Sequence, residues 1–132
     1  MAFNIDADLT EGVWVDFDTD VSFRVRYLMP EKAEDIRKAC SKKKWRGGNM
    51  DERLDDAKHT RMLADYIIQD WKGIVAGNGS PVECTAENKV KLLGKSIEIS
   101  NFIFQTAGDI ANFEAKKQEM EGKNSVSSSP SN

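Results

Sequence analysis

The sequence is poor in the residues that most often carry chemistry. Its 132 residues include one histidine, His59, and two cysteines, Cys40 and Cys84, which lie far apart and form no Cys-x-x-Cys pair. A catalytic triad needs a nucleophile beside a base, and a structural zinc site needs four ligands, mostly cysteine and histidine. Neither site can be assembled from this set. We therefore expect no enzymatic activity, no metal and no cofactor.

Long hydrophobic runs are also missing. No apolar stretch approaches the ~18 residues that a membrane helix requires, so we expect neither a span nor a membrane anchor. No secretory signal peptide is recognisable at the N-terminus. A reduced, cytoplasmic setting is therefore expected, in which Cys40 and Cys84 serve as small buried hydrophobes.

Basic residues are absent from the first 23 positions, which carry six acidic ones. Residues 24–61 reverse this balance, with twelve basic residues against seven acidic. The chain has a net charge of −3 and is 39% hydrophobic, a composition typical of a soluble globular protein. The acidic segment either folds against the basic one or faces a different partner. We expect an acidic arm over residues 1–11, one domain over 12–121 and a disordered tail over 122–132.

Two short segments near the N-terminus alternate between apolar and polar residues. The first covers residues 12–17 and the second covers residues 21–28, with the turn-forming Asp18, Thr19 and Asp20 between them. Alternation with period two in β-branched and aromatic residues indicates strands. We therefore predict a β-hairpin whose apolar face packs on helices, because a lone hairpin is marginal in water.

Helical patterns follow the hairpin. Pro30 suits the start of a helix that ends near Cys40, and residues 42–49 have the composition of a loop. A second helix is expected from a cap at Asn49 or Asp51 to about Gln69. The fold predicted is therefore α+β, an N-terminal β-hairpin packed on a bundle of three to four α-helices.

The segment from 70 to 89 combines a buried aromatic residue, a turn and a helix cap. Trp71 is placed in the core at the junction between helix and turn, and residues 77–81 give the strongest turn signal in the chain. Thr85 is a good N-cap for a helix that Gly94 is expected to end, and Ser96 is a good N-cap for the last one. That last helix is predicted to run to about Met120.

The last predicted helix is apolar on more than one side, which indicates a central position or cover by another chain. Plain core is the commoner explanation for such aromatic residues. A groove for an apolar helix is the functional one, with methionines as adaptable contacts. The candidate partner-binding residues are Met62, Phe102, Phe104, Ile110, Phe113 and Met120.

Two other patterns have some features of binding sites. Asp16, Asp18 and Asp20 resemble the start of a calcium loop, but the glycine and the glutamate that such a loop requires are missing. The basic run 42–46 suits phosphates, with Trp45 stacking on a base. A basic loop anchored by tryptophan is commoner, and the acidic net charge does not favour a nucleic-acid partner.

The segment 70–89 resembles the small tail assembly chaperones of long-tailed bacteriophages and their prophages. The likeness covers most of residues 12–121, and recognisable identities lie in residues 70–89 alone. Where an acidic turn is more usual in that family, this sequence has residues 76–79, Ala-Gly-Asn-Gly. The motif residues that carry the resemblance are Asp70, Trp71, Gly73, Gly79, Pro81 and Thr85.

The resemblance implies a non-enzymatic protein in the cytoplasm of the bacterial host. Such chaperones bind the tape measure protein, keep it soluble and help the tail tube protein to assemble around it. The oligomeric state stays open, a homo-oligomer included. One alternative is a phage or prophage structural protein, a minor tail or head–tail component, and a second is a small nucleic-acid-binding module using residues 42–46.

Overall fold

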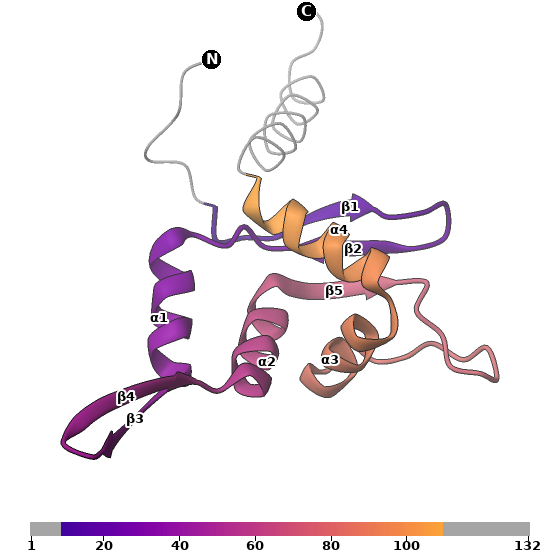
Figure 1. Ribbon diagram of the computed structural model, residues 1–132. Helices are drawn as coiled ribbons and strands as arrows, with labels where there is room; N and C mark the ends of the chain where they lie inside the picture. Colours follow the sequence, from indigo (N-terminus) through magenta and orange to yellow (C-terminus); the bar gives the residue numbers. More distant parts are fainter. Residues whose placement is uncertain (1–8, 110–132) are drawn as a thin grey trace, which may run out of the picture.

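The computed structural model describes residues 9–109, and these form four helices and five strands (Figure 1). The architecture is α+β with an N-terminal hairpin, as the sequence predicts. In chain order the elements are β1 (Val13–Asp16), β2 (Ser22–Val25), α1 (Pro30–Cys40), β3 (Ser41–Arg46), β4 (Asn49–Leu54), α2 (Asp56–Ile67), β5 (Ile68–Lys72), α3 (Ala86–Lys95) and α4 (Ile97–Gly108).

The main sheet has three antiparallel strands in the order β1-β2-β5. β1 and β2 form the expected hairpin, in which Val13 lies opposite Val25. β5 comes from much later in the chain and pairs with the other edge of β2, so that Trp71 lies opposite Phe23. The helix predicted to reach Gln69 ends earlier, because this strand already begins at Ile68. The third strand supplies pairing that an isolated hairpin lacks.

The two faces of this sheet have different environments. Residues that lie opposite one another share a face, so the alternation in β1, β2 and β5 places the apolar side chains together. Val13, Phe23, Val25 and Trp71 are buried on this apolar face. Polar residues dominate the other face, where Lys72 Nζ lies 4.4 Å from the centre of the ring of Trp14.

Helix α4 crosses the apolar face of the sheet (Figure 1). The Phe102 ring lies 5.3 Å from that of Phe17 and 6.5 Å from that of Phe23, and Ile103 and Ala107 are buried beside them. Helix α2 packs against both α1 and α3. Burial of each large apolar side chain contributes about 1.5–3 kcal/mol. This single cluster is therefore the main source of stability for the described residues.

Residues 42–49 do not form the predicted loop. β3 and β4 pair as an antiparallel two-stranded ribbon, which projects from the end of α1 (Figure 1). Gly47 and Gly48 connect the strands with φ of 57° and 84°. Positive φ at both central residues is the geometry of a two-residue hairpin turn, and glycine adopts it without steric cost.

Helix α2 consequently starts later than predicted. Asn49 and Asp51 do not cap it, because both belong to β4. Asp55 is the cap, and its carboxylate accepts a hydrogen bond of 3.2 Å from the backbone N–H of Lys58. This backbone hydrogen bond lowers the pKa of Asp55 most. The charge of the nearby Lys42 ammonium lowers it further, by less.

The caps predicted for the last two helices are confirmed. Thr85 caps α3 and Ser96 caps α4 through their hydroxyl oxygens. Gly94 does not end α3, which runs to Lys95, and α4 ends at Gly108, while the segment from 110 to Met120, also predicted as helix, lies outside the described residues. The carbonyl of Ala107 accepts a hydrogen bond of 2.9 Å from the Leu28 backbone N–H, which ties this helix end to the segment after β2. The expected tail, residues 122–132, and most of the expected arm lie outside the described residues, although Leu9 from that arm is buried in the core.

Candidate functional site

Trp71 connects the sheet to the segment that follows it. Its side chain is 7% exposed and meets the Phe23 ring edge-to-face at 6.5 Å, so the predicted core position is confirmed. The indole N–H donates a hydrogen bond of 2.8 Å to the carbonyl oxygen of Val82. A buried indole N–H needs such a partner. The bond fixes the far end of the loop between β5 and α3 against the core.

Gly73 directs the chain out of the sheet. It has a φ of 85°, and a Cβ at this position would lie 1.9 Å from the carbonyl oxygen of Asp20. Glycine is therefore required both by the backbone conformation and by the close approach to the β1–β2 turn. Just before it, the carboxylate of Asp70 accepts a hydrogen bond of 2.8 Å from the backbone N–H of Trp71.

The loop of residues 74–82 is tied together along its length. Backbone hydrogen bonds of 2.9 Å join Val82 N–H to the Ile74 carbonyl and Ala76 N–H to the Ser80 carbonyl. Between them, Val75 and Pro81 form an isolated β-bridge. At the tip Gly79 has a φ of 85°. This loop, called here the 74–82 loop, therefore behaves as a short hairpin rather than as a loose connection.

Helix α3 forms the second wall of the site. The Thr85 hydroxyl accepts a hydrogen bond of 3.2 Å from the Asn88 backbone N–H, and the Asn88 amide donates one of 2.9 Å to the Glu83 carbonyl. Lys89 is 6% exposed, and its ammonium lies 3.0 Å from the Asp65 carboxylate on α2. This ion pair anchors the helix that faces the 74–82 loop.

A hollow of about 360 Å³ lies between the 74–82 loop and α3. Its size falls in the range of small binding pockets. Val75 is 57% exposed on its rim, whereas Val82 and Leu92 are half-buried against the core. We call this hollow the apolar groove. It is lined by Ile74, Val75, Ala76, Gly77, Val82, Asn88, Lys91, Leu92 and Lys95.

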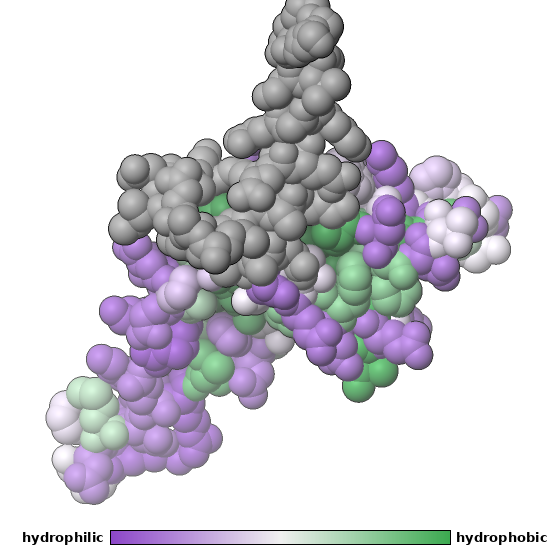
Figure 2. All heavy atoms as spheres, turned by 90° about the horizontal axis from the view of Figure 1, so that it is seen from above, coloured by the Kyte–Doolittle hydropathy of each residue, from purple (hydrophilic) through white to green (hydrophobic). Residues whose placement is uncertain are grey.

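The charged side chains that line the apolar groove are both positive. Lys91 and Lys95 lie one turn apart on α3, and they are the charged residues that line the apolar groove. Just outside, Cys84 is half-buried, and its burial raises the pKa of the thiol. Figure 2 shows hydrophobic surface in the right half of the molecule, the half in which Figure 1 places the start of α4 as well as α3 and the 74–82 loop. An apolar segment flanked by acidic residues would match these properties.

The motif residues of segment 70–89 are brought together by this arrangement. Asp70, Trp71 and Gly73 fix the start of the 74–82 loop, Gly79 and Pro81 shape it, and Thr85 starts α3. Each of them supports a wall of the apolar groove, and none lines its interior. The sequence motif therefore builds the site without contacting what the site would bind.

Three of the candidate partner-binding residues, Met62, Phe102 and Phe104, belong to the part of the chain that the structure describes, and they do not line the apolar groove. Phe102 and Phe104 are half-buried against the core, and Met62 lies 3.5 Å from Cys40, sulfur to sulfur. Ile110, Phe113 and Met120 lie outside the described residues. Their role in binding stays a prediction. Sequence reasoning missed Val75, because an apolar residue beside a turn gives no periodic signal of exposure. It missed Leu92 because an apolar residue on an amphipathic helix indicates core packing rather than a binding surface.

Residues 9–109 lack the groupings that two other kinds of site would need. This part of the chain holds no group of three or more His, Cys, Asp or Glu side chains placed to bind a metal ion. Nor does any helix in this range have the length and apolar character needed to cross a membrane. Cys40 and Cys84 are both free thiols, and Cys40 is buried as predicted.

The fold and the groove define a small α+β protein with a preformed apolar hollow on its surface. The chain belongs to the YdaY prophage protein family, whose model matches residues 28–124. The match includes the whole of the apolar groove and the β3–β4 ribbon. Neither the curated proteins nor the solved structures contain a match to the chain. The protein is therefore phage-associated, as its resemblance to phage proteins implied.

Proposed function

We propose that this prophage protein is a tail assembly chaperone that binds the tape measure protein and assists assembly of the tail tube. On this proposal it acts by covering apolar helical segments and not by catalysis. Membership of a prophage family supports the phage part of the proposal. The sequence likeness of residues 70–89 to tail assembly chaperones supports the rest.

The apolar groove is the observation that carries the proposal. Its walls are fixed by Trp71, by the cross-bonded 74–82 loop and by the cap of α3, so little ordering is needed when a partner binds. Amphipathic helices bind such hollows through apolar side chains spaced three or four residues apart. Lys91 and Lys95 would pair with acidic residues beside those anchors.

Co-expression with the tape measure protein of the same prophage tests the proposal. The wild-type chain should raise the soluble fraction of the tape measure protein and co-purify with it. Val75→Glu should weaken binding by roughly tenfold or more, because it replaces an apolar contact on the rim with a charged group that loses its hydration when the partner binds. Met50→Glu is the matched control, since Met50 is 51% exposed against 57% for Val75 but lies on the ribbon.

Two outcomes would contradict the proposal. A tape measure protein that stays equally insoluble with and without this chain would remove the chaperone role. Recovery of the chain from purified virions in a fixed ratio to tail subunits would favour the alternative, a structural tail or head–tail component. Mass spectrometry of virions measures that ratio directly.

A further inference from the structure

The β3–β4 ribbon has two chemically different faces. Paired residues share a face and successive residues alternate, so the register of the strands assigns every side chain to one face or the other. The pairs Lys42–Arg53, Lys44–Asp51 and Arg46–Asn49 lie on one face, which we call the basic face. The opposite face holds the pairs Ser41–Leu54, Lys43–Glu52 and Trp45–Met50.

Positive charge is in excess on the basic face. Four cations, two lysines and two arginines, share this face with one carboxylate, Asp51, and a second carboxylate, Asp55, lies at the base of the ribbon. Arg53 lies 3.2 Å from Asp51, and Lys42 lies 3.6 Å from Asp55. For Lys44 and Arg46, residues 9–109 provide no carboxylate within ion-pair distance. A hollow of about 100 Å³ is lined by the four basic side chains and by Asp51, whose carboxylate is paired with Arg53. This volume is about three times that of a water molecule in the liquid, which suits a small anionic group.

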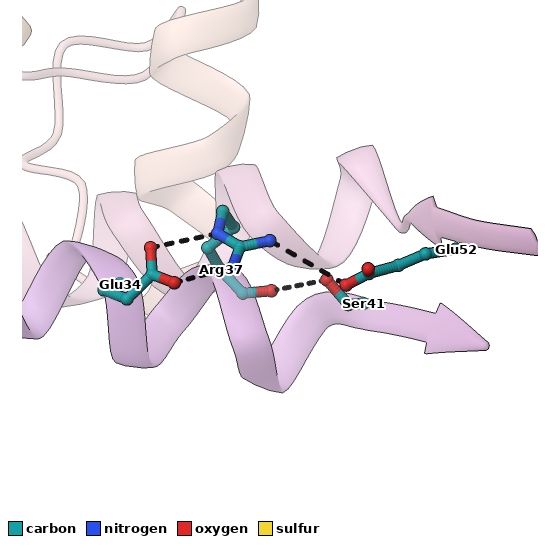
Figure 3. Close-up of polar contacts among 4 residues, drawn as sticks. All are labelled: Glu34, Arg37, Ser41 and Glu52. Atoms are coloured by element: carbon teal, nitrogen blue, oxygen red, sulfur yellow. Dashed lines mark hydrogen bonds and ion pairs between the residues drawn. The ribbon is translucent and has the colours of Figure 1, made fainter.

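The opposite face is neutralised by a brace from α1 (Figure 3). Arg37 donates two hydrogen bonds to Glu34, of 3.0 and 2.6 Å, and its third nitrogen lies 3.8 Å from Glu52. The Ser41 hydroxyl donates a hydrogen bond of 3.1 Å to the Arg37 carbonyl oxygen. The pairing with Arg37 lowers the pKa of Glu34, so this carboxylate stays charged. The brace holds Glu52 away from the basic face and fixes the ribbon to the helix.

The ribbon carries an exposed aromatic side chain near its tip. Trp45 is 71% exposed, although a tryptophan side chain is normally largely buried. It lies between Lys44 and Arg46 on β3, whose outer edge is unpaired within the described residues, as is that of β4. A flexible polymer bound along the edge of β3 would contact the basic side chains on one face of the ribbon and the Trp45 indole on the other face.

Charge is also separated across the molecule. The acidic turn between β1 and β2 and the basic ribbon lie at opposite ends of Figure 1. The ribbon end, at the left of Figure 2, is largely hydrophilic, with a small paler and green area at its tip. Exposed charges more than a Debye length of about 8 Å apart are largely screened at physiological salt. The net charge of −3 therefore does not describe the field at the ribbon.

From these observations we propose that the β3–β4 ribbon binds single-stranded nucleic acid. Phosphates bind along the basic face at Lys42, Lys44 and Arg46, and Trp45 stacks on a base. Single strands are favoured over duplexes because an exposed indole stacks on an unpaired base. This site is separate from the apolar groove and does not depend on the proposed chaperone function.

Binding of fluorescein-labelled oligo(dT) and oligo(U) to the full chain, measured by anisotropy over a salt series, tests the proposal. The affinity should fall steeply with salt, with a slope that reports about 0.7 per phosphate contact. Lys44→Gln should weaken binding roughly fivefold and lower the slope by about 0.7. Lys43→Gln, the matched control on the opposite face, should change it less than about twofold.

A second variant tests the stacking contact. Trp45→Ala should weaken oligonucleotide binding by roughly tenfold with little change in the salt slope, since stacking is sequence-tolerant and releases no counterions. Both lysines and the tryptophan are exposed, so the circular dichroism spectrum and melting temperature should stay as in the wild type. Preference for oligo(dT) or oligo(U) identifies DNA or RNA as the ligand, and either result supports the proposal.

Several results would overturn it. Absence of oligonucleotide binding at low salt would do so, as would an equal loss in the Lys43 and Lys44 variants. Duplex DNA bound as tightly as single strands would remove the role of Trp45. Competition by polyglutamate at the same charge concentration would show that the ribbon binds acidic proteins instead.

Discussion

Gly73 and Gly79 share a backbone conformation but differ in what surrounds them. Both have a φ of 85°, whereas a Cβ would lie 1.9 Å from the Asp20 carbonyl at the first and in open space at the second. Gly79→Ala should therefore cost about 1–2 kcal/mol of unfolding free energy, for the left-handed conformation alone. Gly73→Ala should cost about 3 kcal/mol or more, because the turn must also move. Urea denaturation of both variants measures the difference, and equal losses would show that the β1–β2 turn yields freely.

Trp71 combines packing with one hydrogen bond, and two variants separate these contributions. Trp71→Ala should lower the unfolding free energy by about 3–5 kcal/mol, as buried large-to-small substitutions do. Trp71→Phe keeps much of the ring contact with Phe23 but leaves the Val82 carbonyl without its donor. It should cost about 1–3 kcal/mol. Thermal unfolding followed by circular dichroism measures the stability of both variants. An unchanged melting temperature in Trp71→Ala would mean that the Trp71 side chain does not stabilise the core.

At the level of elements, the ribbon is an appendage to the domain. None of residues 42–50 is buried, and Ser41 and Leu54 at its base lie opposite each other. Deleting residues 43–46 and 49–52 together leaves Lys42-Gly47-Gly48-Arg53, which keeps the turn and the register. The unfolding free energy should change by less than about 1 kcal/mol, as for other exposed sites.

The same deletion distinguishes the two proposed sites. Solubilisation of the tape measure protein should be retained, while oligonucleotide binding should be lost. Thermal unfolding provides the control for folding. A large drop in melting temperature would contradict the view that the ribbon is dispensable for the fold.

Local signals account for the elements that the sequence predicts correctly. Each of these signals acts within a few residues, so it can be recognised in the sequence. They are the alternation before residue 28, Pro30 at the start of α1, and the capping hydroxyls of Thr85 and Ser96. The ribbon escapes prediction because lysine-rich strands have no apolar alternation and low β propensity. Its available signal is the Gly47–Gly48 pair between polar segments of equal length.

Non-local features of the sheet and the site are beyond local rules. β5 pairs with β2, and this pairing depends on the whole intervening chain. The local pattern carries no sign of it and instead predicts that the preceding helix runs on to about Gln69. The motif in residues 70–89 marks the right region for the apolar groove. It does not reveal which side chains line the groove, because the positions of Val75 and Leu92 depend on how the 74–82 loop packs against α3.

On the scale of the whole molecule, the described residues carry two surfaces at different ends. The apolar groove lies beside α3, and the ribbon projects beyond α1 (Figure 1). A partner at one of them leaves the other open. The two proposals can therefore fail or succeed independently, and a double variant with one substitution at each site tests whether the effects add.

The order of strands in the sheet also constrains how the protein is made. Strand β2 sits at the centre, yet its second neighbour follows a helix, the ribbon and another helix in the chain. During synthesis, Phe23 and Val25 therefore leave the ribosome well before Trp71 and Ile68 can cover them. Closing so long a loop is an entropic barrier, and mixed topologies of this kind fold more slowly than helical bundles. A nascent chain that pauses before β5 has been made would expose the apolar face of the β1–β2 hairpin. We therefore expect the speed of translation across residues 26–67 to affect the yield of folded protein.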